Sequence, residues 1–231
     1  MMLTQTAVSQ SFQSRPSFPF SVDVDWALPD RERDAGPAGI PMSFARNSEI
    51  YGEAEPAGLI YLVVAGVVRA SKLLPDGRRQ ISAFHMAGDL FGFEPDEVRH
   101  FSAEAVVPTK LVAFKWQGLI AAGVRSGAFI RELLHVTMKG LRHTQEQLLL
   151  IGRKNALERV AAFLLEMGNR TGNRGVVELA MPRHDIADYL GLTLETVSRM
   201  FAELRSLGAI ELDGARCVRV LDLEQLTGLG S

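Results

Sequence analysis

The sequence has a single cysteine, Cys217, and no hydrophobic run long enough to cross a bilayer. One thiol excludes an internal disulfide and a cysteine-cluster metal site. The longest apolar run, IYLVVAGVV (60–68), is far shorter than a membrane-spanning helix. The N-terminus also lacks the apolar core of a signal peptide, so we expect a cytoplasmic protein without a membrane partner. A net charge of −2 does not by itself indicate a polyanionic partner.

What the chain does contain is typical of a globular protein, with 47% hydrophobic and 23% charged residues in 231. Residues 1–28 are rich in Ser, Gln, Thr and Pro and predict a mobile arm. Residues 29–125 predict an antiparallel β-roll. Within them a Pro-Asp-Gly turn (75–77) joins two strand-like runs, and glycines recur about every ten residues.

Residues 126–154 predict one long helix whose apolar positions alternate in steps of four and three, as in a coiled-coil dimer. The alternative is a core helix that packs on its own domain, but the strict alternation favours a dimerisation helix. The predicted dimer seam consists of Ile130, Leu134, Thr137, Leu141, Thr144, Leu148 and Ile151.

Residues 155–231 predict a winged helix-turn-helix, which makes the fold class α+β. Asn155 can cap a first helix, and RHDIADYLGLTLETVSRMFAEL predicts two further helices around a turn at Gly191. The helices would cover 183–190 and the residues after Thr193, a good N-cap. LGAIELDGARCVRVLDL then predicts a β-hairpin wing around an Asp-Gly turn.

The second of these helices carries an unusual polar face, which predicts contacts to DNA bases. Arg199 can donate two hydrogen bonds to guanine, Glu195 can accept from cytosine N4, and Ser198 can touch a base edge or a thymine methyl. The alternative is a Glu195–Arg199 salt bridge on a solvated face, which the helix-turn-helix context makes less favoured. The candidate phosphate contacts are Arg183, Thr193, Thr196, Arg216 and Arg219.

With these motifs the chain resembles the Crp/Fnr family of bacterial transcription regulators over about residues 40–225. ETVSR (195–199) matches the E-x-x-S-R motif of the Fnr-like members, and FGFE, FSAEA and DIADYLGLTLETVSR resemble its FixK branch. The resemblance implies a homodimer that recognises double-stranded DNA at TTGA and its inverted repeat TCAA. It also implies an activator that recruits RNA polymerase to genes for low-oxygen respiration or nitrogen fixation.

The effector chemistry of the relatives is absent from the sequence, so we expect no cofactor. Phe93 and Phe101 stand where cyclic-nucleotide-binding relatives hold the phosphate with Glu and Arg, and one cysteine cannot hold an iron–sulfur cluster. Cys217 is interpreted as a packed side chain rather than a sensor. No catalytic constellation or metal site stands out, so no enzyme is expected. The alternatives are a sensor that binds haem or another ligand and a dimerising interaction module that does not read DNA. The candidate haem ligands are His85, His100, His135, His143 and His184.

Overall fold

The computed structural model describes residues 39–94, 96–125 and 127–230, so the predicted arm of residues 1–28 lies outside the described residues. The described chain forms two compact units. The first comprises residues 39–68 together with Phe84–Thr137. The second comprises Met138 onward together with the β-hairpin segment Arg69–Ala83.

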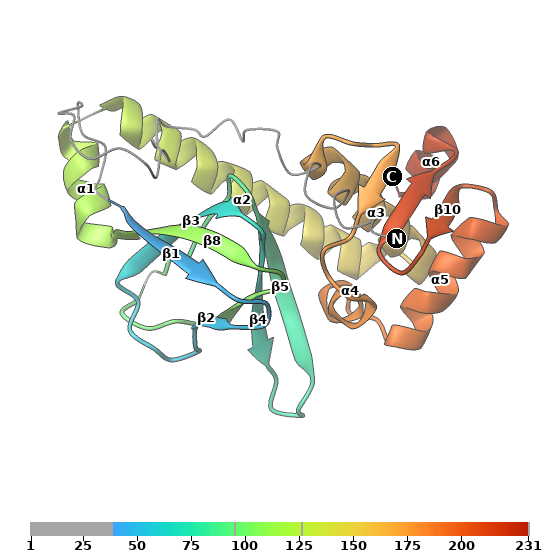
Figure 1. Cartoon of the computed structure of the whole chain (residues 1–231), viewed down its shortest axis with the longest axis horizontal. Coiled ribbons are helices and arrows are strands. Elements are labelled where there is room, and N and C mark those ends of the chain that lie inside the picture. Colours follow the sequence, from blue (N-terminus) through green and yellow to red (C-terminus); the bar gives the residue numbers. More distant parts are fainter. Residues whose placement is uncertain (1–38, 95, 126, 231) are drawn as a thin grey trace, which may run out of the picture. The chain divides into compact units, whose positions relative to one another are not determined.

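The strands between Ile40 and Lys115 form an antiparallel roll of two four-stranded sheets, as the sequence predicted (Figure 1). The hairpin segment Arg69–Ala83 of the second sheet is the part that belongs to the second unit. One sheet has the order β1-β8-β3-β6: Ile40–Phe44, Thr109–Lys115, Leu59–Ala65 and Leu90–Phe91. The other has the order β2-β7-β4-β5: Glu49–Tyr51, Ser102–Ala105, Val67–Leu73 and Arg79–Met86. The Pro-Asp-Gly turn joins β4 to β5, and Gly77 has a φ of +83°, which favours glycine.

The roll has two apolar clusters because successive side chains of a strand point to opposite faces. Tyr61 and Val63 of β3 pack into one cluster, and Ile60 and Leu62 of the same strand pack into the other. The second cluster is covered by residues of the long helix α2, including Leu133. Part of α2 therefore packs on its own domain, which was the alternative interpretation of that helix.

Two helices follow the roll, α1 (Trp116–Arg125) and α2 (Gly127–Arg153). The long helix α2 confirms the predicted helix within a residue at each end. The sequence does not predict the helix α1, whose residues fall within the expected roll (29–125). Leu119 of α1 is buried in the cluster that also holds Phe114 of β8, which explains why the segment folds back as a helix.

The second unit contains the predicted winged helix-turn-helix. Its elements are α3 (Ala156–Thr171), β9 (Val176–Glu178), α4 (Arg183–Leu190), α5 (Leu194–Ser206), β10 (Ile210–Asp213), β11 (Cys217–Val220) and α6 (Leu223–Gly230). Asn155 caps α3 in a capping box with Glu158, as a polar residue at that position predicts. The wing hairpin β10–β11 is extended by β9 into a three-stranded antiparallel sheet. The terminal helix α6 was not predicted.

Candidate nucleic-acid interface

The helices α4 and α5 form the two arms of a helix-turn-helix (Figure 1). Gly191 ends α4 with a φ of +64°, and the amide of Leu192 donates to the Ala187 carbonyl at 3.0 Å. Thr193 caps α5, since its hydroxyl accepts a hydrogen bond from the Thr196 amide at 3.2 Å. The buried side of α5 is formed by Val197, Met200, Phe201 and Leu204. These contacts fix which face of α5 is turned to solvent.

The face of α5 opposite this buried side carries the three predicted base-reading residues. Glu195, Ser198 and Arg199 are all exposed. In the described part of the chain no ion pair joins Glu195 to Arg199, so neither charge is neutralised by the other. Hydrogen bonds from the Glu195 backbone amide and from Thr193 hold the pKa of the Glu195 carboxyl below its ordinary value. Glu195 is therefore an ionised acceptor at neutral pH, which suits an amino donor such as cytosine N4.

Arg183, a candidate phosphate contact, begins α4 but is partly buried rather than extended into solvent. Its guanidinium carbon lies 3.2 Å from the centroid of the Phe201 ring, and burial lowers the Arg183 pKa to about 10. Its Nη1 is buried and has no hydrogen-bond partner among the described residues. A buried donor without a partner costs free energy, and a phosphate oxygen can reach this atom only if the Arg183 side chain moves. Stacking on Phe201 thus ties this cation to the buried side of α5.

The other candidate phosphate contacts differ in how free their side chains are. Arg216 is exposed next to the wing turn, whereas Arg219 pairs with Glu211 across the wing at 2.7 Å. Both partners of this pair are about half exposed, so the pair stabilises little and a phosphate can compete for Arg219. Thr193 and Thr196 lie at the N-terminus of α5, where backbone amides favour an anion.

The predicted dimer seam on α2 is largely exposed in the single chain. The side chains of Leu134, Leu141 and Leu148 are 55%, 53% and 73% exposed. The hydroxyls of Thr137 and Thr144 donate to carbonyls one turn earlier in the helix, which leaves them little need for water. Ile151 is partly buried, and of Ile130 only its place in α2 is described. Exposed leucines at heptad spacing are typical of a helix that meets a partner helix.

Phe93 stands where the resemblance predicts a charged phosphate ligand in relatives, and sequence reasoning missed a cation near that position, Arg99. Phe93 lies at the surface and packs edge-to-face on Trp116, with ring centroids 6.4 Å apart. Arg99 is only 2% exposed and donates to the carbonyls of Gly92 and Leu59, both at 2.6 Å. Its guanidinium also lies 4.1 Å from the centroid of the Tyr51 ring. Both Nη groups of Arg99 therefore donate to carbonyls inside the roll, whereas its Nε is buried without a hydrogen-bond partner among the described residues.

The five histidines do not converge on a common site. His85 stacks on Phe91 with centroids 4.9 Å apart, and His100 lies 2.9 Å from Glu94. His143 contacts the Tyr189 hydroxyl at 3.3 Å, His184 lies beside Asp185, and His135 is exposed on α2. Across the described ranges, no cluster of three or more His, Cys, Asp or Glu side chains could hold a metal ion. Cys217 is partly buried in β11.

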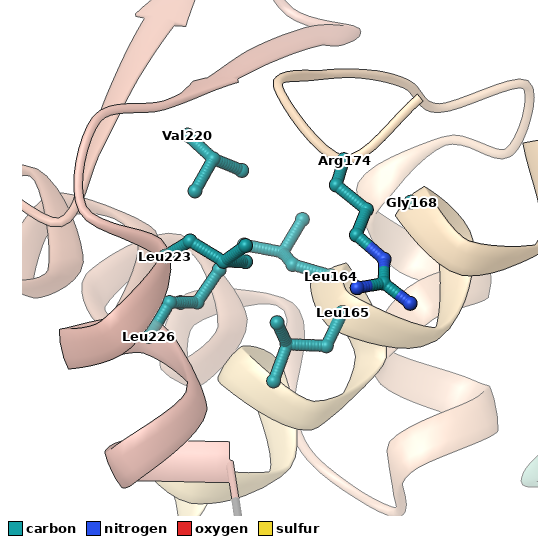
Figure 2. Close-up of a pocket in the computed structure, with 7 residues that line it drawn as sticks. All are labelled: Leu164, Leu165, Gly168, Arg174, Val220, Leu223 and Leu226. Carbon is teal, nitrogen blue, oxygen red and sulfur yellow. The ribbon is translucent and has the colours of Figure 1, made fainter. Parts of the chain in front are cut away.

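A small recess lies between α3, α6 and the wing of the second unit (Figure 2). It has room for about one water molecule, too little for a nucleotide or haem. Its lining residues are Leu164, Leu165, Gly168, Arg174, Val220, Leu223 and Leu226. Figure 2 shows the leucines of α3 and α6 gathered around it, which is the packing that holds the terminal helix.

None of the described helices is both long and apolar enough to traverse a membrane.

The winged helix-turn-helix with its exposed polar α5 and the antiparallel roll together define a DNA-binding transcription regulator. Residues 158–229 match the Crp-like helix-turn-helix domain, and residues 41–122 match the cyclic nucleotide-binding domain. The chain is 46% identical over 198 residues to the nitrogen fixation regulation protein FixK of Azorhizobium caulinodans, covering 84% of this chain and 80% of that protein.

A second FixK, that of Rhizobium meliloti, is 40% identical over 84% of this chain and 91% of its own length. The structure of FixK2 from Bradyrhizobium japonicum matches with a TM-score of 0.79 and 44% identity, covering 84% of this chain and 98% of that one. The chain belongs to the Crp/Fnr family and is FixK-like, as its motifs predicted. These relatives are transcription regulators, not enzymes.

Proposed function

We propose that the protein is a homodimeric activator that reads a TTGA…TCAA palindrome through α5. The observation that carries the proposal is the exposed face of α5, where Glu195, Ser198 and Arg199 lie together without an ion pair between the acid and the base in the described chain. Arg199 takes guanine, and Glu195 takes the cytosine paired with it. Arg183, Thr193, Thr196, Arg216 and Arg219 contact phosphates and set the register.

Dimerisation through α2 supplies a second copy of α5, which contacts the second half-site of the palindrome. The exposed leucines of α2 provide an apolar seam, and Met138, which is also exposed, widens it. A two-fold symmetric dimer places two copies of α5 on an inverted repeat, which is the symmetry of TTGA…TCAA. The names of the FixK relatives support control of nitrogen-fixation genes. Control of low-oxygen genes and recruitment of RNA polymerase in the cytoplasm belong to the same proposal.

The experiment that tests this function is a titration of the purified protein, without added effector, against the palindrome and a scrambled duplex of equal length. Specific binding is expected to be at least about 10³-fold tighter than binding to the scrambled duplex at the same salt concentration. Equal affinity for both duplexes would contradict sequence-specific reading by α5.

The protein is further proposed to work without a cyclic nucleotide, and adding cyclic AMP should change neither the melting temperature nor DNA affinity. The phosphate of the nucleotide would find Phe93 and Phe101 in place of charged donors, and Arg99 is engaged with carbonyls. A ligand raises stability only if it binds the folded state, so thermal unfolding at increasing cyclic AMP measures binding directly. A dose-dependent rise in melting temperature would refute this assignment.

The second candidate, a haem-bound sensor, has one observation in its favour: His85 and Tyr61 both stack on Phe91 in the aromatic cluster of the roll. An absorption spectrum of protein purified from haem-replete cells decides between the two. A Soret band that is lost in His85→Ala supports the sensor, and a spectrum without one supports the ligand-free activator.

A further inference from the structure

The first helix of the helix-turn-helix, α4, carries a fully buried carboxylate. Asp185 is 0% exposed, yet it stands in the first turn of a helix at the edge of the DNA-reading motif. Its Oδ2 accepts a hydrogen bond from Arg69 Nη1 at 2.8 Å, and its Oδ1 pairs with Arg79 Nη2. His184 Nε2 lies 3.1 Å from the same Oδ1. A buried charge is tolerated only when it is paired in this way.

Arg79 reaches a second carboxylate on the same helix. Its Nε donates to Asp188 Oδ2 at 2.8 Å, and its Nη2 lies 2.7 Å from that oxygen. The neighbouring Gln80 donates through Nε2 to the backbone carbonyl of Asp188 at 2.7 Å. Asp185 and Asp188 are about one helical turn apart, so one planar guanidinium bridges two points on α4. This geometry restricts both the rotation of α4 and its sliding along the hairpin Arg69–Ala83.

The opposite end of α4 is held by other side chains of the same unit. Gln147 of α2 donates to the Tyr189 carbonyl at 3.2 Å, and Arg159 of α3 donates to the Leu190 carbonyl at 3.0 Å. Only the turn 191–193 separates α4 from α5. A displacement of α4 would therefore also displace α5 and its exposed face with Glu195, Ser198 and Arg199.

The preceding arginine provides a contrast within the same hairpin. Arg78 pairs with Asp76 of its own turn at 2.6 Å, and its side chain is 79% exposed. Arg78 thus makes a local surface contact, which stabilises little, while Arg79 is directed to α4. The two positions differ in partner but not in residue type, which makes Arg78 a matched control.

We propose that Arg69 and Arg79 are positioning residues for DNA recognition, which act by holding Asp185 and Asp188 of α4. Buried ion pairs seldom add much stability relative to apolar packing, but they select one geometry, because a displaced helix would leave a charge unpaired. The hairpin Arg69–Ala83 is accordingly a functional part of the DNA-binding unit. This inference rests on the DNA reading proposed above for α5.

The test compares Arg79→Gln, Asp188→Asn and the double variant with Arg78→Gln, all in the full-length protein. Asp188 is used because its side chain is 29% exposed and its loss is less disruptive than that of the buried Asp185. Arg79→Gln is expected to weaken binding to the palindrome by roughly threefold to thirtyfold, with a smaller change on a scrambled duplex. Arg78→Gln should bind the palindrome like the wild type. The double variant should lose no more than the stronger single variant, because both remove the same pair.

Two readouts separate positioning from other roles. Removing the negative charge of Asp188 should tighten binding to every duplex if only charge matters, whereas positioning predicts weaker binding to the palindrome. A direct phosphate contact by Arg79 would lower the slope of log affinity against log salt by about one, whereas positioning leaves the slope unchanged.

The proposal is overturned if Arg79→Gln binds the palindrome as Arg78→Gln does, if Asp188→Asn binds both duplexes more tightly, or if the Arg79→Gln salt slope falls by about one. A wild-type protein that does not prefer the palindrome contradicts the proposed target sequence rather than the positioning role. In that case the same variants are compared on the duplex that wild-type protein selects from a random pool, where the same results are expected and the same results overturn the proposal.

Discussion

Replacing Leu141 and Leu148 together with aspartate is expected to convert the protein to monomers and to weaken binding to the palindrome by roughly 10²–10⁴-fold. Both side chains are more than half exposed in the single chain and lie one heptad apart on α2. A dimer would bury them, and buried unpaired carboxylates cost far more than the seam can supply. A monomer also loses the gain from binding two half-sites at once. Analytical ultracentrifugation and duplex titration measure the two effects.

The control for this prediction is His135→Asp combined with Arg142→Asp. These two residues are also exposed and one heptad apart on α2, but they lie outside the predicted seam. The control variant should remain dimeric and bind the palindrome. If the leucine variant stays dimeric with unchanged melting behaviour, the seam is assigned to the wrong face of α2.

Arg199→Ala is expected to cost ~1–3 kcal/mol of binding free energy on the palindrome, with little change on a scrambled duplex. The exposed guanidinium contributes to specific binding through guanine O6 and N7, which only the cognate site presents in register. Arg183→Ala serves as the comparison, because a phosphate contact should weaken both duplexes alike and reduce the salt slope by about one. If Arg199→Ala also weakens binding to the palindrome and to the scrambled duplex alike, Arg199 contacts only the DNA backbone. Other residues would then read the bases.

The helix-turn-helix could be predicted from the sequence because its signals are local. The N-cap Thr193, the turn residue Gly191 and the apolar stripe with Val197 and Phe201 all lie within about ten residues of one another. Each signal favours the same structure, and agreement between local preferences is what specifies a fold. The wing could be predicted equally well, because its Asp-Gly turn lies between two short strands with alternating apolar residues.

The two helices α1 and α6 could not be predicted because tertiary packing, not propensity, determines them. The sequence of α6 contains Gly228 and Gly230, which disfavour an isolated helix. Leu226 is nevertheless fully buried in the second unit, and Lys154 Nζ donates to the carbonyl of Gly230. Burial of an apolar side chain outweighs the intrinsic preference of so short a segment.

The charged contacts of the candidate site were missed for a different reason. Arg69 and Asp185 are 116 positions apart, and Arg79 and Asp185 are 106 apart, so no local pattern connects them. No local signal marks Asp185 either, because an acidic residue in the first turn of a helix is common. Likewise Arg99 was passed over because an arginine in a loop-like segment is normally a surface residue.

The measurement that tests the central claim most directly is a thermodynamic cycle between Arg199 and the guanine of TTGA. Wild-type protein and Arg199→Ala are each titrated against the palindrome and against a duplex with both guanine–cytosine pairs changed to adenine–thymine. If Arg199 reads guanine, the base change should weaken wild-type binding by ~1–3 kcal/mol per half-site. It should weaken Arg199→Ala clearly less, because that variant loses only the proposed contact of Glu195 with the paired cytosine. If the loss of binding free energy from Arg199→Ala and the loss from the base change simply add in the combined case, Arg199 does not interact with the guanine. Arg199 of α5 would then not read this base.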